Sequence, residues 1–98
     1  MVLGDGVILQ DGVILGKRAR LAPTSTARGS DDAPLVIEAG AAICAGAIVF
    51  RGARIGPGAI VGDQAYVRER AVVGAGTVVG RGSLIDNDVV LGDRVRIQ

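Results

Sequence analysis

Aliphatic residues recur at every sixth position along most of the chain. From Ile37 to Ile97, each block of six residues opens with isoleucine, valine or leucine, and the fifth position is small or β-branched. A period of six does not match the 3.6-residue period of an amphipathic helix. It is typical of the hexapeptide repeat of a parallel β-helix. The pattern therefore predicts an all-β fold in which the first-position side chains from Ile37 to Ile97 point inward.

The same repeat begins near the N-terminus in a different phase. Four hexads open with leucine, at Leu3, Leu9, Leu15 and Leu21. The next hexad should open at Ala27, but the pattern resumes only at Ile37, so residues 27–36 hold one hexad plus four extra residues. This stretch, ARGSDDAPLV, is rich in residues that favour turns. It is either a tolerated surface loop or a loop that lines a ligand or a neighbouring subunit.

The length predicts one domain. Within residues 1–98 we expect N-terminal coils over 1–26, a loop insertion over 27–36 and regular coils over 37–98.

Glycine has a fixed place in the repeat. It occupies the fourth position of eight hexads, at Gly6, Gly12, Gly40, Gly46, Gly52, Gly58, Gly76 and Gly82. A fixed place indicates a corner with positive φ, which glycine adopts without the steric cost of a Cβ. Asparagine and aspartate can also adopt this conformation. The polar stretch Asp86–Asn87–Asp88 is therefore either one more corner or part of a ligand site.

Charged residues indicate three hexads per coil. In such a coil, residues 18 apart lie on neighbouring strands, about 4.8 Å from each other. Four pairs of opposite charge have this spacing: Arg51 and Glu69, Asp63 and Arg81, Arg68 and Asp86, Arg70 and Asp88. They favour a three-sided coil, and a chain of this length then forms about five coils.

Composition limits the possible functions. The net charge of +1 argues against a protein that binds nucleic acid or acidic membranes. The chain has one cysteine, no signal peptide and no apolar run near the roughly 20 residues of a membrane-spanning helix. We therefore expect a cytoplasmic protein.

The hexads resemble the [LIV]-[GAED]-x-x-[STAV]-x pattern of bacterial hexapeptide-repeat acyltransferases. The stretch from Ile85 to Gln98, IDNDVVLGDRVRIQ, is similar to the sugar-nucleotide N-acetyltransferases of surface-polysaccharide synthesis. The resemblance implies a single-stranded left-handed parallel β-helix shaped as a triangular prism, and a homotrimer. It also implies that acetyl-coenzyme A (acetyl-CoA) binds between adjacent prisms and that a histidine takes the proton from the amino group of a sugar nucleotide.

This chain has no histidine. The resemblance therefore supplies no catalytic residue, and the three histidine ligands of the γ-type carbonic anhydrases, which share the repeat, are absent, so we expect no metal. The chain also lacks the atypical capping repeat of a solenoid, and we expect it to be a fragment of a longer protein. Two hypotheses remain: an acetyltransferase that is incomplete as given, or a non-catalytic structural or oligomerisation module.

Candidate binding residues interrupt the glycine pattern. Gln64 and Arg70 stand at fourth positions, and the stretch between them contains the only tyrosine. Arginine suits the phosphates of coenzyme A or of a sugar nucleotide because it binds them with two parallel hydrogen bonds. The predicted substrate- or cofactor-binding residues are Gln64, Tyr66, Arg68, Arg70, Asp86 and Asn87. The alternative is a solvated face with ion pairs between coils.

Further apolar residues stand at the sixth position, which faces outward. They recur 18 apart as Ile48, Tyr66 and Leu84, as Ile60 and Val78, and as Val72 and Val90. Exposed apolar stripes usually mark an interface, so we place the contacts of the expected homotrimer there. Phe50 and Cys44, at second positions, should also point outward, and Cys44 is interpreted as a plain surface residue.

Overall fold

The computed structural model describes residues 1–20 and 33–98, which contain no helix and form 14 short strands. The strands are β1 (Val2–Leu3), β2 (Ile8–Leu9), β3 (Ile14–Lys17), β4 (Val36–Ile37), β5 (Ala42–Ile43), β6 (Ile48–Phe50), β7 (Arg54–Ile55), β8 (Ile60–Val61), β9 (Tyr66–Val67), β10 (Val72–Val73), β11 (Val78–Val79), β12 (Leu84–Ile85), β13 (Val90–Leu91) and β14 (Arg96–Ile97). No helix in this part of the chain is long and apolar enough to cross a membrane.

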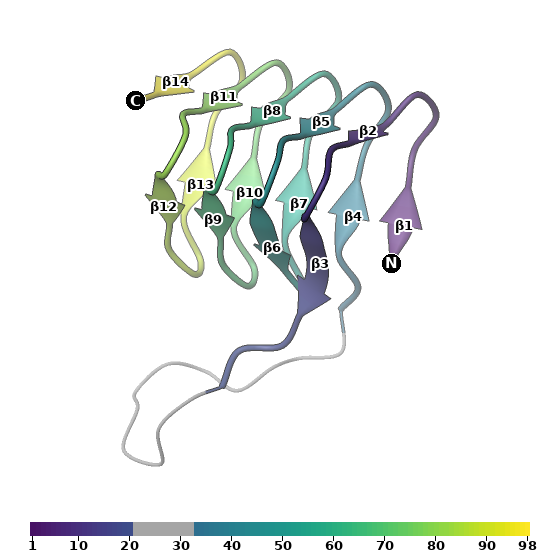
Figure 1. The fold of residues 1–98 in the computed structure, drawn as a ribbon. Coiled ribbons are helices and arrows are strands. Elements are labelled where there is room, and N and C mark those ends of the chain that lie inside the picture. Colours follow the sequence, from purple (N-terminus) through teal and green to yellow (C-terminus); the bar gives the residue numbers. More distant parts are fainter. Residues whose placement is uncertain (21–32) are drawn as a thin grey trace.

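The strands form three parallel sheets, and successive strands belong to different sheets (Figure 1). Sheet A has the order β1-β4-β7-β10-β13, sheet B the order β2-β5-β8-β11-β14, and sheet C the order β3-β6-β9-β12. From β4 onward, paired residues are 18 positions apart, as in Ile37 beside Ile55 and Val49 beside Val67. This register confirms the spacing of three hexads per turn and is consistent with the predicted parallel β-helix.

The pairing of the first three strands shows that the chain has more extra residues between β3 and β4 than the sequence pattern predicted. Leu3 lies beside Ile37 and Leu15 beside Val49, so these partners are 34 positions apart. The chain between β3 and β4 thus holds 16 residues beyond the 18-residue period, where the sequence pattern indicated four. The hexad predicted at Leu21 and residues 27–32 of the predicted loop lie outside the described residues.

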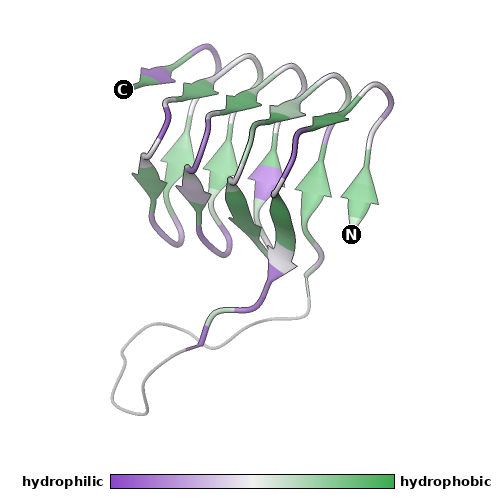
Figure 2. Cartoon of the chain, viewed as in Figure 1, coloured by the Kyte–Doolittle hydropathy of each residue, from purple (hydrophilic) through white to green (hydrophobic). Residues whose placement is uncertain are grey.

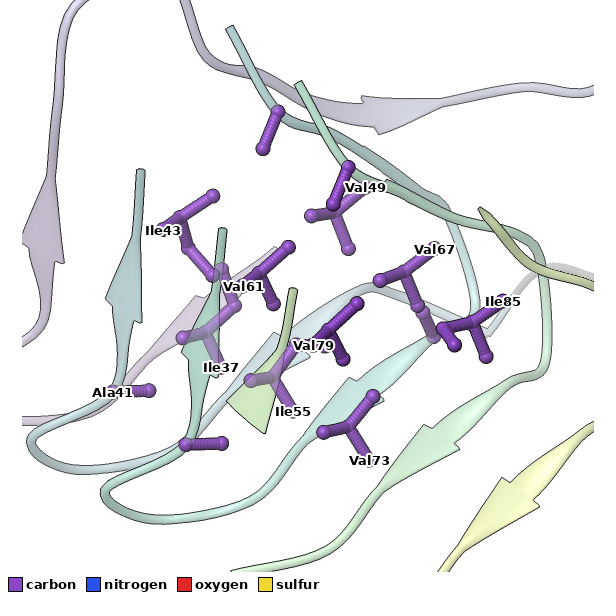
Figure 3. Packing of buried hydrophobic residues seen from close by; sticks show 14 of the residues in the cluster. Ile37, Ala41, Ile43, Val49, Ile55, Val61, Val67, Val73, Val79 and Ile85 are labelled. Atoms are coloured by element: carbon purple, nitrogen blue, oxygen red, sulfur yellow. The ribbon is translucent and has the colours of Figure 1, made fainter. Parts of the chain in front are cut away.

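Aliphatic side chains of the first positions fill the space between the three sheets (Figure 3). Nine of them are at most 5% exposed: Ile37, Ile43, Val49, Ile55, Val61, Val67, Val73, Val79 and Ile85. Leu91 and Ile97 are partly buried and pack against this cluster. The inward orientation predicted for the first positions is therefore confirmed. The fifth positions from Ala41 to Ala71 are alanines that are also buried, so large and small side chains alternate inside.

The turns between strands share one backbone conformation. All eight fourth-position glycines have positive φ, as predicted. Gln64, Arg70, Asp88 and Arg94 occupy the same position of their hexads and have φ between 55° and 65°. Second-position glycines such as Gly56 serve another purpose, because the coils approach closely there. A Cβ on Gly56 would lie 2.7 Å from the backbone nitrogen of Ala75.

Candidate functional site

The six predicted binding residues lie on sheet C and in the turns at its two edges. Tyr66 is the first residue of β9, and its side chain is exposed on the outer face of sheet C. Arg68, Arg70, Asp86 and Asn87 come together at the edge where the chain passes from sheet C to sheet A, between β9 and β10 and between β12 and β13. We call this the C–A edge.

Gln64 lies at the opposite edge of sheet C. It occupies the turn between β8 of sheet B and β9 of sheet C. We call this the B–C edge. The six residues therefore do not form one cluster.

Arg70, in the turn between β9 and β10, forms an ion pair with Asp88 of the next coil. Arg70 Nε donates to Asp88 Oδ1 at 2.7 Å, and Arg70 Nη2 donates to Asp88 Oδ2 at 3.1 Å. Asn87 Nδ2 also donates to Asp88 Oδ2, and the Asn87 backbone N–H donates to Asp86 Oδ1. The predicted pair of Arg70 and Asp88 is confirmed. Asp88 thus serves both as a left-handed corner and as the partner of Arg70.

Arg68 does not pair with Asp86, so that prediction is wrong. Its Nε donates to Glu69 Oε1 at 2.8 Å and its Nη2 to Glu69 Oε2 at 3.3 Å. The guanidinium carbon lies 4.9 Å from the centre of the Phe50 ring, a cation–π distance. Phe50 stands one coil before Arg68. Its ring packs against the Arg68 guanidinium, which donates to the carboxylate of Glu69.

Phe50 itself is 5% exposed, although it is not part of the interior cluster. The Glu69 side chain is also nearly buried, at 6% exposed. The ion pair of Arg70 and Asp88 joins two coils, as in the alternative interpretation, whereas Arg68 and Glu69 pair within one coil.

The B–C edge contains an open hollow of ≈ 540 Å³, lined by Ala45, Asp63, Gln64, Arg81 and Gly82. Gln64 is the only predicted binding residue among them. Asp63 and Arg81 have the 18-residue spacing expected of an ion pair. Within residues 1–20 and 33–98, however, no salt bridge joins them. A second hollow of ≈ 350 Å³ continues from Arg81 to Gly80 and Gln98.

Sequence reasoning paired Asp63 with Arg81 and did not propose either as a ligand-binding residue. Their positions in the sequence could have indicated a shared site with Gln64. Asp63 and Arg81 are third-position residues one coil apart, and they lie beside the turn that contains Gln64. Cys44 lies next to this hollow in sequence and is half-buried. Burial, and secondly the negative charge of Asp63, raise the pKa of its thiol. This supports the interpretation of Cys44 as an unreactive surface residue.

Metal-ligand side chains do not gather in the described part of the chain: no three histidine, cysteine, aspartate or glutamate residues there lie close enough together to hold an ion. Comparisons of the chain with protein families, with curated proteins and with solved structures gave no match.

Proposed function

We propose that the three sheets form a left-handed β-helix of about five coils, and that the protein belongs to the cytoplasmic hexapeptide-repeat acetyltransferases. Its substrates in this proposal are acetyl-CoA and an amino sugar nucleotide. One observation carries the proposal: from Ile37 to Ile97, the first and fourth positions of the pattern that resembles this family each have one structural role. First positions and alanines at fifth positions point inward, and fourth positions form the corners.

Acetyl-CoA is proposed to lie along the outer face of sheet C, between two prisms of a homotrimer. Tyr66 is 43% exposed there and presents an aromatic ring to a ligand. Gln64 borders the same face. Arg68 and Arg70 are engaged with carboxylates, so a phosphate can reach them only by displacing Glu69 or Asp88.

The 98 residues supply positioning rather than proton transfer. Holding donor and acceptor together can lower a reaction barrier substantially. The acceptor amine must nevertheless lose a proton, and a positioned base typically contributes about 10²–10⁴-fold to the rate. No histidine is present to act as that base. We therefore expect the chain alone to bind acetyl-CoA and to show no transfer above background.

A non-catalytic structural or oligomerisation module is the second candidate. The paired side chains at the C–A edge favour it, because Arg68, Glu69, Arg70 and Asp88 satisfy one another without a ligand. The exposed apolar residues of the sheet faces favour it as well, since they suit contacts between copies.

Binding of acetyl-CoA to the chain separates the two candidates. Saturation-transfer NMR should detect binding, and Tyr66→Ala should weaken it, whereas Val2→Ala on sheet A should not. Thiol release with a panel of amino sugar nucleotides should stay at background. Absence of binding at millimolar acetyl-CoA would leave the structural module as the function. Turnover that disappears in Asp63→Asn or Glu69→Gln would show that a carboxylate acts as the base.

A further inference from the structure

We propose that the hollow at the B–C edge binds a small ligand that carries both a protonated amine and an anionic group. Its volume of ≈ 540 Å³ lies within the range of about 300–1,000 Å³ that is usual for small-molecule sites. The inference does not depend on acetyl transfer, because it rests on the side chains of this edge alone.

Asp63 and Arg81 place opposite charges at the hollow, and in the part of the chain that the structure describes they form no ion pair with each other. Asp63 and Arg81 stand in the third positions of successive coils and are both exposed. Among the residues that the structure describes, their side chains make no hydrogen bond or salt bridge. The C–A edge differs, because there Arg70 and Asp88 close on each other. Asp63 can therefore accept hydrogen bonds from an ammonium group, and Arg81 can bind a carboxylate or phosphate with two donors.

Gln64 adds a group that can both donate and accept. Its φ is 58°, whereas Gly46 and Gly82 fill the same corner in the coils before and after it. A side chain in this conformation costs roughly 1–2 kcal/mol. The Gln64 side chain lines the hollow.

The backbone around the hollow is fixed by the coil ladder. The Gln64 backbone N–H donates to the Ala45 carbonyl oxygen at 2.9 Å, and the Gly82 backbone N–H donates to the Asp63 carbonyl oxygen at 2.9 Å. Ala45 and Gly82 are small, and they leave the space between the polar groups open. The site is therefore preorganised at the backbone, and only three side chains need to adjust to a ligand.

The same chemistry occurs in amino sugar phosphates and in amino acids, so both serve as probes. We suggest titrating the 98-residue chain with glucosamine 6-phosphate and with β-alanine while recording amide NMR spectra. Glucosamine and glucose 6-phosphate, which each lack one of the two charged groups, are the controls. At least one zwitterion should shift the amides of Ala45, Gln64 and Gly82 and should bind at least about fivefold more tightly than either control, since one exposed charge pair is worth up to about 1 kcal/mol. The tighter zwitterion identifies the source.

Variants test which side chains hold the ligand. Asp63→Asn and Arg81→Gln should each weaken binding of the tighter zwitterion by about fivefold. Glu38→Gln and Arg54→Gln make the same charge changes at an ion pair on the sheet A side, where Arg54 Nε lies 2.8 Å from Glu38 Oε1, and they should leave binding unchanged. Amide spectra of the free variants report whether each is folded. The proposal is wrong if neither zwitterion binds, if singly charged probes bind equally well, or if all four variants bind alike.

Discussion

At the scale of single residues, the corner of each hexad depends on backbone conformation more than on contacts. Gly58 has a φ of +69°, and no other atom lies within 4 Å of the place where its Cβ would stand. A substitution there is therefore penalised by the left-handed conformation and not by a clash. The loss of unfolding free energy in such a variant measures the cost of placing an L-residue at the corner.

We predict that Gly58→Ala lowers the free energy of unfolding by about 1 kcal/mol, because an L-residue is disfavoured at positive φ. Gly92→Ala is the matched control. Gly92 does not have positive φ, and its Cβ would meet nothing closer than Val95 Cγ2 at 3.9 Å. Urea unfolding followed by circular dichroism gives both values. Equal destabilisation of the two variants would contradict the role assigned to the corner.

The corner conformation could be predicted from sequence, whereas the side-chain partners could not. Glycine recurs at a fixed place, which indicates one repeated φ. The pairing of Arg68 with Glu69 depends on the Phe50 ring beneath the guanidinium, and spacing alone cannot show that. The hollow could not be predicted for the same reason. A spacing of 18 suggests that Asp63 and Arg81 pair, but it does not determine the direction in which each side chain points.

At the scale of elements, most strands have only two residues, one directed inward and one outward. Ile43 of β5 is fully buried, whereas Ile60 of the neighbouring strand β8 is 40% exposed. Such short strands have little stability of their own and depend on the coils before and after them. A cavity in one coil should therefore weaken the whole stack.

We predict that Ile43→Ala lowers the free energy of unfolding by about 2–5 kcal/mol, the usual cost of a large-to-small change in a core. Ile60→Ala removes the same atoms from an outward position and should change it by no more than about 0.5 kcal/mol in the monomer. Thermal or urea unfolding of dilute samples measures both. Comparable losses in the two variants would mean that the interior is not the main source of stability.

The sequence predicted the regular elements because one period governs their strands, turns and interior. It predicted the N-terminal part less well. Leucines continue the pattern to Leu21, but the first three strands pair 34 positions away. A repeat of first-position leucines shows which side chains can be buried, but not which later hexad lies beside them.

At the scale of the whole molecule, the outer face of sheet C carries exposed apolar side chains. Ile14 is 49% exposed, Tyr66 43% and Leu84 60%. Figure 2 shows β3, β6 and β12 as hydrophobic strands on this face, with polar turns at their ends. Exposed apolar side chains on one face usually mark an interface. In the proposed homotrimer this face packs against a different face of the next copy, because a closed ring of three subunits is built from contacts between two different surfaces.

We predict a homotrimer at micromolar concentration, and we expect Leu84→Asp to shift it toward monomer, because burying an unpaired carboxylate in an apolar contact is costly. The variant should keep its strand spectrum, since Leu84 points away from the interior cluster. Ala39→Asp adds the same charge in an exposed turn between β4 and β5, away from sheet C, and should leave the trimer intact. Sedimentation equilibrium measures all three proteins. A monomeric parent chain, or a trimer unaffected by Leu84→Asp, would show that this face of sheet C is not the contact between copies.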